Sequence, residues 1–207
     1  KEELDVDILD QTNIFHIGSL SLTDQPARDT TFYAVKRAKN KGSIISYDPN
    51  YRSSLWENEE IAKEHMRSLL PYVDIIKISD EETELLSGYE NVIEAAEELY
   101  RQGVKIVAIT LGRNGTYIYN KDGGRIVEGF AVEYVADTNG AGDSFWGGFL
   151  SRFLSYEKEL EQMTWDELKN CAVTGNAVAS LCVRKRGGIP AVPSRDEVEA
   201  FLHSTLA

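Results

Sequence analysis

The sequence predicts an open α/β sheet, mostly parallel and flanked by helices, with a site at the carboxyl ends of its strands. Short apolar runs alternate along the chain with segments whose apolar residues recur at helical spacing. A strand, a helix and a strand in succession require parallel pairing with a crossover. Polar or glycine-rich clusters follow directly on the ends of several apolar runs, which is where ligands bind in open parallel sheets.

Each element has its own sequence signal. Apolar or alternating runs predict strands at residues 14–18, 43–47, 74–78, 105–110, 116–120, 125–128 and 131–135. Helical periodicity predicts helices at residues 26–40, 57–70, 91–102, 145–154 and 164–182, a short helix before Gly88 and a last helix after Ser194. Pro26 suits a first helical turn, Pro71 and Gly103 suit helix ends, and Thr164 to Glu167 forms a capping box. We expect a single α/β domain over residues 1–207, because 42% hydrophobic content is enough for a core.

The composition excludes some partners. The formal net charge is −12 and the longest cationic run is Arg184 to Arg186, so neither nucleic acid nor an acidic membrane is expected as a partner. No apolar run approaches the roughly 20 residues of a membrane span. Cys171 and Cys182 fall in one predicted helix, about 16 Å apart, which is too far for a disulfide. Without a disulfide framework, a cytoplasmic location is expected.

The most informative stretch runs from Asp137 to Phe149 and predicts a strand exit, a glycine turn and a helix. Gly140 and Gly142 lack a Cβ, so their backbone can lie close to a ligand while the first N–H groups of the helix point at it. Such a turn favours an anion. Asp143 would repel a bound phosphate, which indicates a task there, such as taking a proton from an attacking hydroxyl.

Two better-known phosphate motifs do not fit this stretch. A Walker loop counted from Gly142 needs a lysine where Gly148 stands. A Rossmann fingerprint counted from Gly140 needs a small residue where Phe145 stands. On the glycines alone, a turn between strand and helix without any ligand stays open.

The string Asp137-Thr138-x-Gly140-Ala141-Gly142-Asp143 resembles the C-terminal signature of the PfkB, or ribokinase-like, family of carbohydrate kinases. The resemblance implies a ribokinase-like fold that binds ATP. It also implies that the backbone of Gly140, Ala141 and Gly142 holds the transferring phosphoryl group, and that Asp143 is the general base on the sugar hydroxyl.

Polar residues follow the second predicted strand, from Asp48 to Arg52. An ordinary Asp-Pro-Asn turn is the simpler interpretation. With Leu55 and Trp56, however, the stretch resembles one found in fructokinases of this family, and a similar one in 2-keto-3-deoxygluconate kinases. The resemblance implies that Asn50 and Arg52 bind the substrate.

Ser79 to Glu82 follow the third strand, and acids there could simply cap a helix. In the family an Asn-x-x-Glu motif stands at this place. By resemblance, Glu82 organises Mg²⁺ through its water shell, and Ser79 contacts ATP although the family's usual residue is Asn.

Thr110 to Gly115 form a second glycine turn after a strand, and Asn114-Gly115 is also a hairpin signal. Both interpretations can hold. By resemblance, Thr110, Gly112 and Gly115 lie along the nucleotide phosphates, Arg113 supplies a cation, and Asn176 lies beside the nucleotide. The resemblance also implies a potassium site built by Asp137, Asn139, Cys182, Gly187 and Ala191.

The predicted reaction is transfer of the γ-phosphate of ATP to a primary hydroxyl of a sugar, with fructose as the expected acceptor. A 2-keto-3-deoxygluconate kinase and a non-catalytic sugar or nucleotide sensor of the same fold stay open. Family members carry an N-terminal segment with a lid that often forms a homodimer, and this segment is missing from the sequence. We therefore expect the 207-residue chain alone to bind sugar poorly and to expose an incomplete sheet edge.

Overall fold

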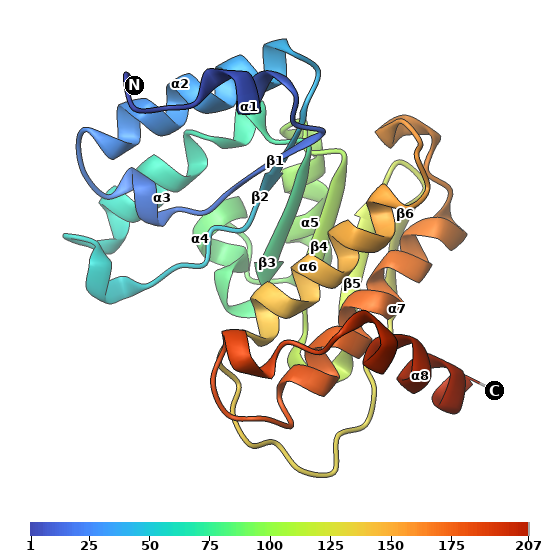
Figure 1. Ribbon diagram of the computed structural model, residues 1–207. Coiled ribbons are helices and arrows are strands. Elements are labelled where there is room, and N and C mark those ends of the chain that lie inside the picture. The colour runs from blue at the N-terminus through green and yellow to red at the C-terminus, as the bar shows by residue number, and fades with distance from the viewer. Residues whose placement is uncertain (207) are drawn as a thin grey trace. The chain divides into compact units, whose positions relative to one another are not determined.

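The computed structural model describes the backbone of residues 1–206 and the side chains of residues 1–205 (Figure 1). Six strands form one sheet in the order β1-β2-β3-β4-β5-β6. The strands are β1 Ile14–Ile17, β2 Ile44–Tyr47, β3 Ile75–Ser79, β4 Ile106–Thr110, β5 Thr116–Asn120 and β6 Gly123–Val127. β1, β2 and β3 pair in parallel, with Ile14 opposite Ile44 and Ser46 opposite Ile75. The predicted open, mostly parallel sheet is confirmed.

The predicted helices are present with small shifts at their ends. Their bounds are α1 Val6–Asp10, α2 Ala27–Asn40, α3 Glu59–Arg67, α4 Thr83–Ser87, α5 Val92–Arg101, α6 Ala141–Leu154, α7 Trp165–Cys182 and α8 Arg195–Leu206. α3 begins after the Asn58 cap and ends before a separate 3-10 turn at Leu70–Tyr72, so it is shorter than expected. The five residues of α1 are too few for a periodicity signal, and Asp5 caps them. None of the helices within residues 1–206 combines the length and hydropathy that a bilayer crossing requires.

The chain divides into two compact units, and the first comprises residues 1–109 and 119–121. Its parallel strands follow one another in chain order, so right-handed crossovers place the connecting helices on one face of these strands. Val35 of α2, Ile45 of β2, Ile76 of β3 and Leu99 of α5 are fully buried between the layers. Within the described residues β1 has β2 as its one neighbour and forms an edge of the sheet. The expectation of a single domain stays a prediction.

The second unit comprises residues 110–118 and 122–207. In it α6 and α7 run side by side (Figure 1). Their backbones approach so closely at Gly148 that a Cβ added there would lie 3.2 Å from the Cα of Gly175. α8 packs on α7 through Val198 and Val178. This close helix pair fixes the direction in which α6 presents its first turn.

The predicted strand at residues 131–135 is wrong. These residues form an irregular segment in which Tyr134 and Val135 are 69% and 51% exposed. The N–H groups of Ala136 and Asp137 donate to the carbonyl of Val183, just beyond α7, rather than to a strand. An alternating pattern forms a strand only when a neighbouring strand supplies hydrogen-bond partners, and the sheet ends at β6.

The capping box of α7 gives a pH-dependent prediction. The Lys158 ammonium, followed by the backbone N–H of Thr164, lowers the pKa of Glu167 from 4.5 to about 2. A carboxyl whose pKa is depressed on folding contributes stability above its unfolded pKa, and this contribution is lost as the pH falls through the folded value. We expect Glu167→Gln to lower the urea midpoint at pH 7, with the difference from wild type shrinking between pH 4.5 and about 2. A difference that does not change over this range would contradict the assignment.

Candidate active site

The first turn of α6 is the candidate anion site. Gly140 precedes the helix with φ of 77°, and a Cβ there would lie 3.1 Å from the Cα of Gly188. The N–H of Ala141 donates to the carbonyl of Thr138 at 3.2 Å. The N–H groups of Gly142 and Asp143 donate to no acceptor within the described part of the chain. Two donors at the positive end of a helix therefore remain for an anion.

The side chain of Asp143 is exposed in the same first turn. It lines a groove of about 780 Å³ that runs along α6, α7 and α8. The carboxylate is therefore accessible rather than packed against hydrocarbon. A base that must reach a substrate hydroxyl needs this accessibility.

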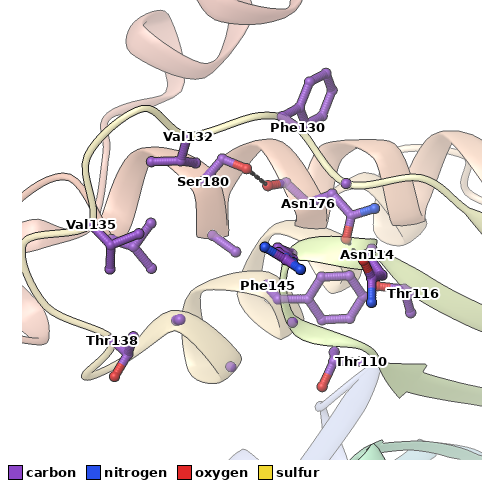
Figure 2. A pocket seen from close by; sticks show the side chains of 18 of the residues that line it. Thr110, Asn114, Thr116, Phe130, Val132, Val135, Thr138, Phe145, Asn176 and Ser180 are labelled. Carbon is purple, nitrogen blue, oxygen red and sulfur yellow. Dashed lines mark hydrogen bonds between the residues drawn. The ribbon is translucent and has the colours of Figure 1, made fainter.

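A second cavity, of about 730 Å³, is lined by Ala141 and Gly142 of the same first turn (Figure 2). The loop around residues 110–116, the irregular segment 129–135, the start of α6 and one face of α7 line it. Its walls are largely apolar, with Phe130, Val132 and Val135 on the side of the irregular segment. Of the predicted nucleotide residues, this cavity is lined by Thr110, Gly112, Arg113, Gly115 and Asn176, together with Ala141 and Gly142. Ser79, also predicted to contact ATP, belongs to the first unit and is not among the lining residues.

The glycine turn at 110–115 is both a hairpin and a wall of the cavity. The N–H of Leu111 donates to the carbonyl of Gly115 at 2.8 Å, and the turn links β4 to its neighbour β5. Gly112 and Gly115 have φ of 56° and 92°. Gly115 lies directly on the chain after β6, since a Cβ there would meet the carbonyl oxygen of Val127 at 2.1 Å. Only glycine allows this approach.

Asn176 holds the wall of the cavity together. Its Oδ1 accepts from the Thr116 hydroxyl at 2.9 Å, and its Nδ2 donates to the carbonyls of Val127 and Glu128 at 3.2 and 3.0 Å. Its backbone carbonyl accepts from Ser180, as Figure 2 shows. The resemblance predicted a residue beside the nucleotide, and the structure adds that the amide ties α7 to β5 and to the chain after β6.

We expect Asn176→Ala to destabilise the protein by roughly 2–4 kcal/mol, because it leaves a buried hydroxyl and two carbonyls without their partner. Asn170→Ala on the same helix is the matched control, since its amide reaches only the exposed Tyr156 hydroxyl. Urea unfolding of both variants checks this. Equal losses in the two variants would contradict the role given to Asn176.

The predicted potassium residues come from three segments of the second unit. Asp137 accepts from the N–H groups of Asn139 at 3.0 Å and Gly187 at 2.9 Å. These two hydrogen bonds, the one from Asn139 first, lower the pKa of Asp137. The thiol of Cys182 lies 3.9 Å from the carbonyl oxygen of Asn139. Ala191 is buried in the loop before α8. The structure thus brings four of the five residues into one contact network.

In the first unit, the exits of β2 and β3 are tied together. Glu82 is buried, and its Oε1 accepts from the N–H of Tyr51 at 2.7 Å. Its Oε2 accepts from the N–H and the hydroxyl of Ser79 at 2.8 and 2.9 Å. Ser79 and Glu82 thus form a capping box at the 3-10 turn Asp80–Glu82, whereas α4 itself begins without a side-chain cap. Asn50 has a left-handed φ of 48°, and Arg52 is exposed.

The sequence interpretation missed Lys77. Its ammonium lies 2.9 Å from Asp48 Oδ2, and both residues are buried. The available signal was a lysine inside the otherwise apolar strand Ile75–Ser79, because a charged residue is rarely buried without a partner.

The open α/β sheet with a glycine turn before α6 defines a ribokinase-like fold. The model of the pfkB family carbohydrate kinases matches residues 1–195. The chain belongs to this family.

The relatives and solved structures agree with this assignment. The chain is 37% identical to Fructokinase-2 of Solanum lycopersicum over 201 residues, covering 97% of the chain and 60% of that protein. It is 34% identical to Fructokinase-1 of Oryza sativa subsp. japonica over 203 residues, covering 98% and 62%. A Vibrio cholerae O395 fructokinase double mutant with fructose, ADP and potassium superposes with a TM-score of 0.85 at 29% identity, covering 92% of this chain and 60% of that one. A Xylella fastidiosa fructokinase with bound ATP gives 0.87 at 26% identity, covering 100% and 66%. The chain thus spans about 60% of the length of the first relatives it matches.

Proposed function

We propose that the protein is an ATP-dependent kinase that transfers the γ-phosphate to a primary hydroxyl of a sugar, with fructose as the acceptor. The observation that carries the proposal is the first turn of α6, where two unpaired N–H groups and an exposed carboxylate stand together. Phosphoryl transfer needs little covalent help from a protein. It needs positioned reactants and donors that stabilise charge on the phosphoryl oxygens.

The phosphate side of the reaction is assigned to the second unit. The N–H groups of Gly142 and Asp143 hold oxygens of the transferring group. The turn at 110–115 follows the other phosphates, and Arg113 adds a cation. Asp143 accepts the proton of the sugar hydroxyl. At the same time the hydroxyl oxygen bonds to the γ-phosphorus, and the bond from this phosphorus to ADP breaks. The backbone assignment differs from the one expected from sequence, because the N–H of Ala141 already has a partner.

The acceptor side is assigned to Asn50 and Arg52 of the first unit. Fructose is favoured because relatives that the chain matches over 97% and 98% of its own length are named fructokinases. A bound Mg²⁺ would neutralise phosphate charge. Glu82 fits a magnesium role only through water, since both of its oxygens already accept hydrogen bonds. Potassium at the Asp137 loop is supported by the Asp137 carboxylate, with the carbonyl of Asn139 on the same loop, and a cation there would strengthen the field at the start of α6.

A cytoplasmic location fits the two free, buried cysteines. A homodimer formed through a lid is the expected assembly of the intact protein. Neither is required for the chemistry proposed above.

The test is ADP release by the intact protein with ATP and a panel of fructose, 2-keto-3-deoxygluconate, ribose and a nucleoside. We expect kcat/KM for fructose to exceed that for every other acceptor by at least about tenfold, a difference of ~1.4 kcal/mol in transition-state binding. A preference for 2-keto-3-deoxygluconate would replace the substrate but keep the mechanism. ADP release that no acceptor stimulates would contradict the proposal and favour a sensor.

A further inference from the structure

The mechanism above leaves one feature of the first unit without a task, the buried ion pair between Lys77 and Asp48. Lys77 is 5% exposed and Asp48 is 4% exposed, and the ammonium lies 2.9 Å from the carboxylate. The register of β2 and β3 pairs Tyr47 with Ile76, so Asp48 and Lys77 occupy the next positions along the two strands. The pair therefore lies directly after the end of β2 and in the middle of β3.

A buried ion pair is weak evidence for stability. The desolvation free energy of the two charges is about as large as their electrostatic attraction. Replacing such a pair with apolar residues of the same size therefore often leaves the stability unchanged. Several other ion pairs of the first unit, such as Lys39 with Asp74, are partly exposed. The location of the Lys77 pair thus needs another explanation.

The segment that follows Asp48 is held at both ends. Asp48 is fixed by Lys77, the carbonyl of Pro49 accepts from the N–H of Ser19 at 3.2 Å, and the N–H of Tyr51 donates to Glu82 at 2.7 Å. Between these anchors Asn50 adopts a φ of 48°. Asn tolerates a left-handed backbone better than other residues with a side chain, and the hydrogen bonds of Pro49 and Tyr51 hold this conformation on both sides.

We propose that Lys77, Asp48 and Glu82 are positioning residues that hold Asn50 and Arg52 in the conformation that receives the acceptor sugar. The inference rests on the proposed function, since Asn50 and Arg52 have their task only in a sugar kinase. Lys77 and Glu82 fix the two ends of the segment from β3 and from the turn after it. Loss of one anchor lets Asn50 relax, and sugar binding must then restore its conformation.

The test compares Lys77→Met with the double variant Asp48→Asn/Lys77→Met in the intact protein. Restoring a left-handed residue costs about 1–3 kcal/mol, so the fructose KM should rise by about tenfold in both variants. The ATP KM should stay within about twofold. The double variant removes the buried Asp48 charge that Lys77→Met leaves without the ammonium. It should therefore be more stable than Lys77→Met but have the same raised fructose KM. A purely structural role would predict that stability and KM recover together. Lys77→Arg, which keeps the charge, should restore part of the affinity.

Lys39→Met is the matched control, because Asp74 lies before β3, at the other end of the strand from Asp48. It should leave the fructose KM unchanged. A fructose KM within twofold of wild type in both the Lys77→Met and the double variant would overturn the proposal.

Amide hydrogen exchange keeps this inference separate from the proposed function. The N–H of Tyr51 should exchange at least about tenfold faster in both test variants, while the N–H of Ile45, bonded to Asp74 at 2.9 Å, should not change. If the wild-type protein phosphorylates no sugar, the proposed function fails, and this exchange measurement decides the positioning role alone. Unchanged exchange at Tyr51 would overturn it.

Discussion

Asp143→Asn is expected to lower kcat by about 10²–10⁴-fold, the usual contribution of a positioned general base. An amide of the same size cannot take the proton from the sugar hydroxyl. The N–H groups of Gly142 and residue 143 stay in place because they belong to the backbone of α6. ATP binding should therefore be retained, and removal of a negative charge beside the phosphates can only favour it. Steady-state kinetics and calorimetric titration with ATP measure the two effects separately.

Asp166→Asn is the matched control for this experiment. Asp166 is also an exposed acid in the first turn of a helix, α7, in the same unit. Its replacement should cost only about 0.3–1 kcal/mol of stability through the helix dipole and leave kcat unchanged. A kcat for Asp143→Asn close to that of Asp166→Asn would show that Asp143 is not the base.

Gly115→Ala is expected to have the largest effect on stability and on nucleotide binding together. A Cβ at this position would lie 2.1 Å from the carbonyl oxygen of Val127 and 2.5 Å from the N of Gly129. Both contacts are with backbone, so no side-chain rotation relieves them, and the φ of 92° is itself strained for alanine. We expect a loss of roughly 3 kcal/mol or more and at least about tenfold weaker ADP binding, since the displaced turn lines the proposed nucleotide cavity.

Gly123→Ala separates the clash from the backbone strain. Gly123 has nearly the same φ, 91°, but an added Cβ would meet nothing within 4 Å. Its cost should be about 1–2 kcal/mol, which is the strain alone, with ADP affinity unchanged. Urea unfolding and calorimetry of the two variants provide the comparison. Similar losses in both would mean that the contact between the turn and the chain after β6 is not rigid.

Local signals predicted most of the fold. Apolar runs, the capping box at Thr164 and stops such as Gly88 act within a few residues, and the structure has most of the helices and strands where they indicated. The segment 131–135 shows the limit of such signals. Its alternation was real, but a strand also requires a neighbour, and pairing is a property of the whole sheet.

The site was predicted as a set of positions rather than as contacts. A glycine turn after a strand indicated Thr110 to Gly115, because ligand sites lie at strand exits. The turn at Gly140 to Asp143 follows an irregular segment rather than a strand, and its glycines and the resemblance indicated it. The Lys77–Asp48 pair depends on the register of two strands, and the three hydrogen bonds of Asn176 join segments about 50 residues or more apart in sequence. Such long-range contacts leave no pattern in a single sequence.

The most direct test is a crystal structure of the intact protein with a non-hydrolysable ATP analogue. We expect oxygens of the terminal phosphate within about 3.2 Å of the N–H groups of Gly142 and Asp143. The adenine ring should lie in the cavity lined by Asn176 and Val135. A triphosphate bound elsewhere, with these two N–H groups facing only solvent, would contradict the account.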